Sequence, residues 1–317
     1  MRTDSYLHDL KDFRDLIQVV SNEKRIMPQL IEKDYWIMHI LYGLAKQGFV
    51  FELKGGTSLS KGYRVIERFS EDIDIRIEPP AELQQVMAGK NHQKPAHVES
   101  RRRFFDWLAE NIHIPGIESV NRDHEFDDDQ FRGAGIRLIY PTTLRAIDGL
   151  KQGILLEVGF DDTTPNEAVD ITSWALDKAT ATGLKFIDNR ALQVKCYHPA
   201  YTLVEKLQAV STKFRQQQES GGFPVNFLRH YYDIYCLLAD PRVQEFIGTD
   251  TYQKRKEQRF RKEDVRCISE NQAFLLHDPA VFQLYTSEYA KTEGLYYAGM
   301  TPFDTIMKRI RGNFDRL

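Results

Sequence analysis

The chain has few cysteines, no long apolar run and almost no net charge, and each shortage excludes a class of protein. Its three cysteines, Cys196, Cys236 and Cys267, lie far apart without metal-ligand spacing, which argues against a disulfide framework and a zinc site. No apolar segment approaches the roughly 20 residues that span a bilayer. The first residues are interrupted by acids, unlike a signal peptide. We therefore expect a cytoplasmic protein with no membrane contact.

The charge balance limits how nucleic acid could be bound. The chain has 43 basic and 46 acidic residues, giving a formal net charge of −3. This excludes a globally basic nucleic-acid coat but leaves room for a local basic patch. Internal repeats and low-complexity tracts are also lacking. At 317 residues the chain can form one large domain or two smaller ones.

The most informative stretch is residues 53–77, LKGGTSLSKGYRVIERFSEDIDIRI. Gly55 and Gly56 have no Cβ, so backbone N–H groups in a tight turn there can approach a phosphate. Thr57 and Ser58 add hydroxyl groups at the expected start of a helix, where the helix dipole favours an anion. The turn is therefore a candidate nucleotide-binding cradle.

The residues after this turn predict a helix and then a strand. Leu59, Tyr63 and Ile66 recur at helical spacing, which predicts an amphipathic helix with a basic outer face. The following DIDIRI segment, which starts at Asp72, alternates between polar and apolar residues as a half-buried strand does. Asp72 and Asp74 must therefore point to the same side of that strand.

Two neighbouring carboxylates need a cation. They repel each other and raise each other's pKa unless a positive charge neutralises them. Mg²⁺ does this well, because it accepts carboxylate oxygens and keeps positions open for water and substrate phosphates. The alternative is a solvated strand edge that exposes Asp72 and Asp74 to water. The glycine turn that precedes them favours the metal site.

This motif resembles the signature of the DNA polymerase β superfamily of nucleotidyltransferases, which is a glycine pair, a helix and then Asp-hydrophobic-Asp. The wording GGTSL from Gly55, followed by RFSEDID from Arg68, resembles more narrowly the AbiEii/AbiGii-type nucleotidyltransferase toxins. Those proteins belong to bacterial abortive-infection (phage defence) and toxin–antitoxin systems. The family also has wording similar to EKDYW from Glu32. We interpret that stretch as a packed amphipathic helix with its charges in solvent.

The resemblance implies an α+β fold. It consists of a polymerase-β-like nucleotidyltransferase core with a mixed sheet and a largely helical C-terminal region. We expect an N-terminal helix in residues 1–24 and the core in residues 25–195. Residues 196–317 would form the helical region that completes the active site.

A third acid lies in the segment ILLEVGF, residues 154–160, which is expected to be a strand. A lone carboxylate in a buried strand costs several kcal/mol or changes its protonation state. If this strand lies beside the one carrying Asp72 and Asp74, Glu157 supplies a third metal-side carboxylate. Its position resembles the third acid of the superfamily. The alternative is an edge-strand acid that faces water.

Two further segments resemble motifs of the family. Lys206 and Lys213 lie two turns apart on a helix that begins near Pro199, so they project to nearly the same side. They could hold the β- and γ-phosphates, or they could be surface lysines. The wording EKLQA around Lys206 resembles the family's lysine motif. Asp233, in RHYYDIY from Arg229, resembles the aspartate of its last motif. That residue could orient Lys206 or a substrate hydroxyl.

The most basic segment is residues 252–266, where aromatic side chains are interleaved with cations. Clustered cations release counterions from RNA, and aromatic rings stack on exposed bases. The alternative is a solvated helix face. The candidate RNA contacts are Lys254, Arg255, Arg259, Arg261 and Lys262.

Together, the resemblance implies an enzyme. Asp72, Asp74 and Glu157 would hold two Mg²⁺ ions, and the glycine turn and lysines would hold the triphosphate of an NTP. A nucleoside monophosphate would pass to an RNA acceptor, such as the 3′ end of tRNA, with release of pyrophosphate. A cognate antitoxin protein would be the partner. Two alternatives remain open: a protein hydroxyl or a small molecule such as an aminoglycoside as acceptor, and a catalytically silent binding module.

Overall fold

The computed structural model describes residues 5–83, 86–89, 93–145, 150–224 and 226–317. The chain forms two compact units. Unit 1 contains Met1–Gly62 and Ser70–Tyr197, and unit 2 contains Tyr63–Phe69 and His198–Leu317. The N-terminal helices thus belong to the same unit as the sheet. A short piece from within the glycine and acid motif belongs to the other unit, which nothing in the sequence indicated.

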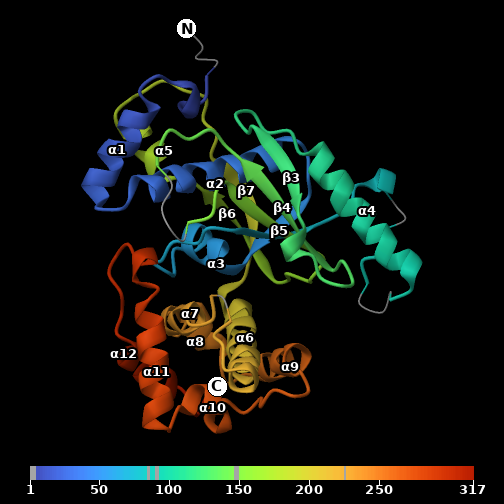
Figure 1. Cartoon of the computed structure of the whole chain (residues 1–317), viewed down its shortest axis with the longest axis vertical. Coiled ribbons are helices and arrows are strands. Elements are labelled where there is room, and N and C mark those ends of the chain that lie inside the picture. Colours follow the sequence, from blue (N-terminus) through green and yellow to red (C-terminus); the bar gives the residue numbers. More distant parts are fainter. Residues whose placement is uncertain (1–4, 84–85, 90–92, 146–149, 225) are drawn as a thin grey trace. The chain divides into compact units, whose positions relative to one another are not determined.

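Unit 1 is built on one mixed sheet (Figure 1), whose seven strands have the order β3-β4-β5-β2-β1-β7-β6. The strands are β1 (Phe51–Lys54), β2 (Ile73–Ile77), β3 (Ser119–Asp123), β4 (Gly133–Ile139), β5 (Ile154–Gly159), β6 (Asn166–Ile171) and β7 (Ala191–Tyr197). The pairs β2–β5 and β1–β7 are parallel, and the other neighbours are antiparallel. The two strands that carry the predicted acids, β2 and β5, are therefore central neighbours.

The helices of unit 1 are α1 (Phe13–Lys24), α2 (Pro28–Lys46), α3 (Gly55–Thr57), α4 (Pro95–Asn111) and α5 (Trp174–Ala181). Short 3₁₀ turns occur at Leu7–Asp9, Ala81–Leu83 and His124–Phe126. Helix α2 begins at Pro28, a residue preorganised for a first helical turn, and packs against α1, α5, β5 and β7. Its residues are buried almost all the way round, as expected of a helix in the middle of a core.

The helix predicted after the glycine pair is much shorter than expected. Helix α3 continues only as a single π-helical turn, Ser58–Gly62, and residues 63–72 contain no helix. At the end of that turn, a Cβ on Gly62 would lie 2.9 Å from the Cys196 sulfur, and Arg64 has a positive φ of 55°. Leu59 and Ile66 are both buried, but in different units. The helical spacing of Leu59 and Ile66 therefore does not mark one helix, because each residue is buried in the core of a different unit.

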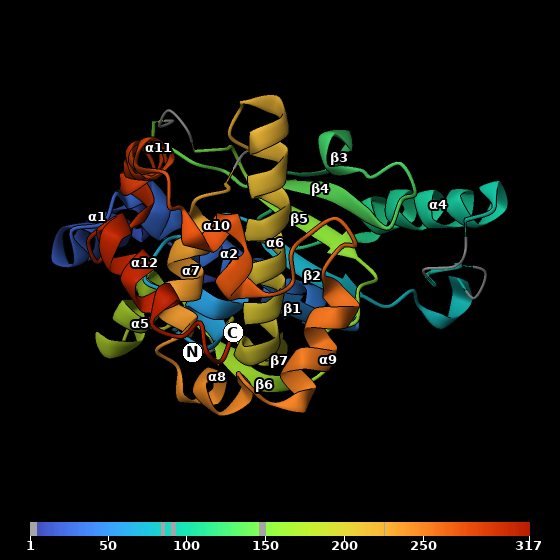
Figure 2. The same cartoon turned by 90° about the horizontal axis from the view of Figure 1, so that it is seen from below.

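Unit 2 is helical. Its helices are α6 (Pro199–Ser220), α7 (Arg229–Leu237), α8 (Pro241–Phe246), α9 (Asp250–Arg259), α10 (Gln272–Leu275), α11 (Pro279–Ala290) and α12 (Phe303–Arg311). Two 3₁₀ turns lie at Ile268–Glu270 and Glu293–Leu295. The long helix α6 packs against α7 on one side and α9 on the other (Figure 2). Several helix starts are capped by a side chain, including those after Asp240, Thr249 and Asp278.

The predicted α+β class, with a mixed sheet and a helical C-terminal region, is confirmed.

Segment 63–69 belongs to unit 2, where the Phe69 backbone N–H donates to the Leu295 carbonyl at 2.8 Å. Among the helices of the described residues, none is both long and apolar enough to cross a membrane.

Candidate active site

Three charged side chains form a row across the centre of the unit 1 sheet. Asp74 on β2 lies directly opposite Glu157 on β5 and opposite Lys54 on β1. Directly opposed residues of neighbouring strands point to the same face, and strands lie about 4.8 Å apart. The structure therefore brings Glu157 beside Asp74, on the face away from the buried Ile73 and Ile75. Asp72 immediately precedes β2.

The glycine turn packs against this row. Gly55 has a φ of +72°, and a Cβ there would lie 2.1 Å from Oδ2 of Asp74. Only glycine suits the position, because any side chain would meet the carboxylate and strain the backbone. The hydroxyl of Thr57 donates to the Asp72 carbonyl at 2.5 Å, and that of Ser58 donates to the Gly55 carbonyl at 3.1 Å. The Thr57 bond ties the turn to the segment that enters β2, and the Ser58 bond closes the turn on itself.

The nucleotide-binding role of the turn stays a prediction. Both Thr57 and Ser58 are buried, and their hydroxyl hydrogens already serve backbone carbonyls. Any donor that the turn offers to a phosphate would therefore be a backbone N–H rather than these hydroxyls. Gly55 and Gly56 remain the residues whose missing side chains would allow that approach.

Burial and mutual repulsion favour the protonated forms of Asp72 and Glu157. Burial raises the pKa of Glu157 to about 8, with Asp74 and Asp72 adding to the rise and Lys54 opposing it. The pKa of Asp72 is also raised, first by burial and then by Asp74 and Glu71. Within the described part of the chain, Asp72, Asp74 and Glu157 form no ion pair. The ammonium of Lys54 lies 3.8 Å from Asp161 instead.

A cavity of about 230 Å³ opens over this face of the sheet. It is bounded by side chains of the acid row and of the segments around β4 and β5. Its lining includes Lys54, Asp74, Phe126, Arg132, Glu157 and Asp161. The cavity gives solvent and small ions access to two of the three predicted metal ligands.

Asp72, Asp74 and Glu157 offer the carboxylate oxygens that a hard divalent cation prefers, although the three side chains do not converge on one point. In the residues that the structure describes, no three Asp, Glu, His or Cys side chains converge as metal ligands. Asp72, Asp74 and Glu157 nevertheless provide three carboxylates from adjacent segments, and burial together with the neighbouring acids raises the pKa of Asp72 and Glu157. A metal ion would have to draw these oxygens together.

The EKD stretch of α2 is buried, so the prediction that its charges face solvent is wrong. Glu32, Lys33 and Asp34 are all inaccessible, and each is paired with another segment of unit 1. The Thr142 hydroxyl donates to Glu32, Lys33 donates to Glu71, and Asp34 binds Lys61. The sequence held a signal of this burial, which is three consecutive charged residues in an otherwise apolar helix. Adjacent residues of a helix point in different directions, so all three cannot face solvent from one side.

A second buried carboxylate lies in unit 2. Asp233 on α7 is fully buried and accepts two hydrogen bonds from the Arg68 guanidinium, at 2.7 and 2.8 Å. The ammonium of Lys206 lies 3.0 Å from the same carboxylate and 3.4 Å from Nδ1 of His230. Burial alone would raise the pKa of Asp233, but Arg68 and Lys206 hold it below its usual range. Arg68 was missed because the sequence placed it on a basic outer face.

This geometry bears on the two roles left open for Asp233. A fully buried carboxylate bonded to Arg68 contacts Lys206 and has no exposed oxygen for a substrate hydroxyl. It therefore favours the role of orienting Lys206. Lys213 lies two turns further along α6 and is half-buried. Phosphate binding by Lys206 and Lys213 stays a prediction.

The basic segment divides into paired and exposed cations. Arg255 and Arg259 lie 3.6 and 3.2 Å from Glu205, and Arg255 is buried. The other three predicted RNA contacts, Lys254, Arg261 and Lys262, are exposed. Only these three present the free surface that the prediction of RNA contact requires.

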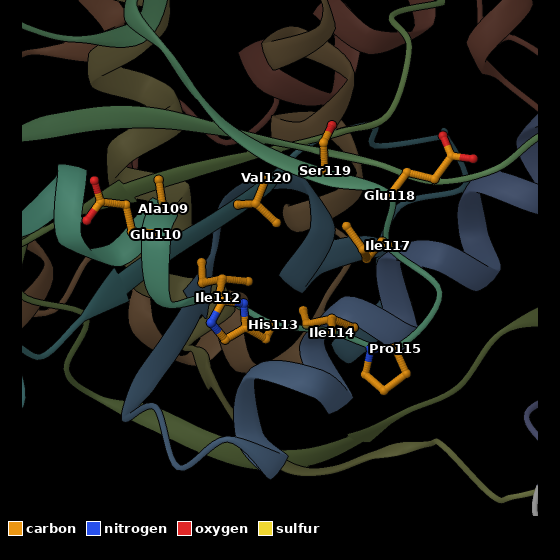
Figure 3. A pocket seen from close by; sticks show the side chains of 10 residues that line it. All are labelled: Ala109, Glu110, Ile112, His113, Ile114, Pro115, Ile117, Glu118, Ser119 and Val120. Carbon is orange, nitrogen blue, oxygen red and sulfur yellow. The ribbon is translucent and has the colours of Figure 1, made fainter.

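A larger hollow on unit 1 lies apart from Lys54, Asp74 and Glu157. It has a volume of about 560 Å³ and is formed by the end of α4 and the segment leading into β3 (Figure 3). Its lining includes Glu110, His113, Ile117 and Glu118. None of the predicted site residues borders it, so volume alone does not locate the chemistry.

Comparison with known proteins identifies one family. A model described as "Nucleotidyl transferase AbiEii toxin, Type IV TA system" matches residues 39–309, which is most of the chain. No curated protein sequence matches.

Two solved structures are similar. MenT4, a nucleotidyltransferase toxin from Mycobacterium tuberculosis, is 14% identical, with 94% of this chain and 96% of that chain covered and a TM-score of 0.49. An antigenic nucleotidyltransferase-like protein from Paracoccidioides brasiliensis is also 14% identical, with 72% and 87% covered and a TM-score of 0.38.

Proposed function

The chain belongs to the AbiEii family of nucleotidyltransferase toxins of type IV toxin–antitoxin systems, and we propose that it moves a nucleoside monophosphate from an NTP to RNA. The proposed acceptor is the 3′ end of tRNA or of another RNA. The observation that carries the proposal is that Asp74 and Glu157 lie side by side, without an ion-pair partner among the described residues, against the Cβ-free surface of Gly55. A catalytically silent binding module has no need of such a costly cluster.

In the proposed reaction the acceptor hydroxyl oxygen attacks the α-phosphorus. The bond from that phosphorus to the bridging oxygen of the β-phosphate breaks, the hydroxyl proton passes to solvent, and pyrophosphate leaves. Asp72, Asp74 and Glu157 are the residues that would hold Mg²⁺, with two ions expected. When bound, the metal would neutralise phosphate charge and lower the pKa of the attacking hydroxyl.

The remaining chain residues bind and orient. Gly55 and Gly56 are proposed to let the triphosphate approach the backbone, and the Thr57 bond to the Asp72 carbonyl holds the turn against the acids. Lys206 and Lys213 are proposed phosphate ligands. Asp233 would not contact the substrate itself. It would fix the position of the Lys206 ammonium.

The RNA part of the proposal is supported by the exposed cations. Lys254, Arg261 and Lys262 are free to displace counterions from a phosphate backbone. Membership of a toxin–antitoxin family also implies an antitoxin partner. We infer that the protein acts in the cytoplasm, where NTPs and RNA are both present.

The test is transfer of ³²P from each α-labelled NTP to total RNA with Mg²⁺. The intact protein is compared with Asp72→Asn/Asp74→Asn, and Asp188→Asn serves as a matched control at an exposed aspartate paired with Arg190. We expect one discrete labelled RNA, lost in the double variant and kept in the control.

Separate acceptor pools decide the substrate class. Label confined to protein, or to an added aminoglycoside, would overturn the RNA proposal while keeping nucleotidyl transfer. No label in any pool with folded protein, or equal label with the double variant, would overturn the assignment of the acids.

A further inference from the structure

The buried charges of α2 hold several other segments of unit 1 in place. Placing a charge in a protein interior costs several kcal/mol unless it is paired and hydrogen-bonded. Glu32, Lys33 and Asp34 are each paired, and no two of them share a partner. Their side-chain partners lie in the glycine turn or in segments next to β2, β4 and β5.

Lys33 makes the contacts nearest to the acids. It is 1% exposed, and its ammonium donates to Glu71 at 3.2 Å and to the Lys151 carbonyl at 2.7 Å. Glu71 directly precedes Asp72, and Lys151 lies in the segment that leads into β5 and Glu157. One ammonium group therefore binds the chain just before both acid-bearing strands.

Asp34 secures the glycine turn from the same helix. One of its carboxylate oxygens binds the ammonium of Lys61, in the π-helical turn that follows Gly55. The other accepts the backbone N–H of Trp174 at 2.9 Å, where α5 begins. Consecutive residues of α2 thus hold the glycine turn and both acid-bearing segments.

We propose that Lys33 is a positioning residue of the active site, which fixes the segments before β2 and β5 so that Asp72, Asp74 and Glu157 can close on a divalent cation. This inference rests on the proposed function, since it takes those carboxylates to be the metal ligands. Groups that hydrogen-bond to metal ligands act in this way, and their loss costs about 10–100-fold in metal affinity or activity. Lys33 binds residues of the chain next to the ligands, so we expect an effect at the lower end of that range.

A purely electrostatic role for Lys33 makes the opposite prediction. A buried ammonium close to the acids repels a metal ion, so removing only its charge would strengthen metal binding. If Lys33 instead holds the backbone, its loss lets Asp72 and Glu157 move apart and weakens binding. The sign of the change in metal affinity therefore distinguishes positioning from charge.

The test is the Mg²⁺ concentration that gives half of the maximal thermal stabilisation, measured for the full chain without NTP. For Lys33→Met, which keeps most of the side-chain volume, we expect this concentration to rise about tenfold. The milder Lys33→Gln, which also removes the charge but keeps an N–H donor for Glu71 and the Lys151 carbonyl, should raise it less. Unchanged or lower values for both variants would overturn the proposal. Lys33→Gln alone decides the outcome if Lys33→Met does not fold.

Two controls separate positioning from stability. Lys256→Met removes another buried ammonium, which donates to the Leu317 carbonyl in unit 2. It should lower the melting temperature without changing the Mg²⁺ response. The double variant Lys33→Met/Glu71→Leu leaves no unpaired buried charge and should regain melting temperature but not Mg²⁺ affinity. Recovery of both would show that Lys33 only stabilises the fold.

The same experiment distinguishes failure of this inference from failure of the proposed function. Asp74→Asn should lose the Mg²⁺ response in every case in which the acids are metal ligands. If Asp74→Asn responds as the intact protein does, the proposed metal site itself is wrong. If Asp74→Asn loses the response and Lys33→Met and Lys33→Gln keep it, only the role of Lys33 is wrong.

Discussion

The half-buried Asp74 and Glu157 of unit 1 and the buried Asp233 of unit 2 have opposite electrostatic surroundings. In unit 2, Asp233 is enclosed by the Arg68 guanidinium and the Lys206 ammonium, and its pKa is held below the usual range. In unit 1, Asp74 and Glu157 lie side by side without an ion-pair partner among the described residues. The pKa of Glu157 rises to about 8.

The difference shows how to separate a structural carboxylate from a ligand. A buried acid whose charge is already neutralised by protein cations needs no metal ion, so its role is to position its neighbours. Two half-buried acids that repel each other are destabilising unless something else supplies positive charge. Asp74 and Glu157 therefore have the electrostatics expected of a cation site, and Asp233 has those of a completed ion-pair cluster.

Breaking the finished cluster should have the largest effect on stability. Asp233→Ala leaves Arg68 and Lys206 buried without their carboxylate, so we expect a loss of about 3–5 kcal/mol in the free energy of unfolding. Urea denaturation measures this loss, with the exposed Asp188→Ala as control. A loss below about 1 kcal/mol would show that Asp233 is not the centre of a buried cluster.

The acid row should make metal-free stability depend on pH. Glu157 has a higher pKa in the folded state than in the unfolded chain, so the folded state binds its proton more tightly. Its contribution is full below about pH 4.5 and is lost as the pH rises toward 8. In EDTA we expect the free energy of unfolding to fall by about 3 kcal/mol more in the intact protein than in Glu157→Gln between pH 5 and pH 8. Parallel curves for the two proteins would contradict the raised pKa.

Removing one acid should stabilise the metal-free protein while destroying activity. Asp74→Asn relieves repulsion with Asp72 and Glu157, and we expect a gain of about 1–2 kcal/mol at pH 8 in EDTA. Nucleotidyl transfer should fall at least about 100-fold. Denaturation and label transfer on the same preparation measure both. A destabilised variant would mean that the carboxylate has a stabilising partner, as Asp233 does.

The exposed cations should have the smallest effect, which falls on RNA binding alone. Lys254→Gln/Arg261→Gln/Lys262→Gln removes unpaired charges, so we expect about tenfold weaker RNA binding and a shallower salt dependence, with unchanged stability. Arg255→Gln breaks a buried pair with Glu205, so it should lower stability instead. Unchanged RNA affinity in the triple variant would remove this surface from the proposal.

Local patterns in the sequence predicted the parts of the site that depend on local chemistry. The alternation from Asp72 defined β2, and the isolated acid in ILLEVGF identified Glu157 as unusual before its neighbour on β2 was known. The glycine pair predicted a position that tolerates no side chain, and Gly55 is one.

The parts that the sequence did not predict depend on pairing between distant segments. Helical spacing from Leu59 to Ile66 was produced by two different cores. The burial of Lys33 depends on Glu71 and Lys151, and that of Arg68 on Asp233, more than 160 positions away. Charge type and spacing alone cannot separate a solvated side chain from one whose partner lies far along the chain.

Calorimetric titration of Mg²⁺ into the intact protein, Asp74→Asn and Glu157→Gln tests the central claim most directly. If the uncompensated row in unit 1 is a cation site, the intact protein binds Mg²⁺ and both variants bind it at least about tenfold more weakly, while Asp188→Asn binds as the intact protein does. Equal affinity in all four proteins would contradict the account, because the repelling carboxylates would then have no cation to hold.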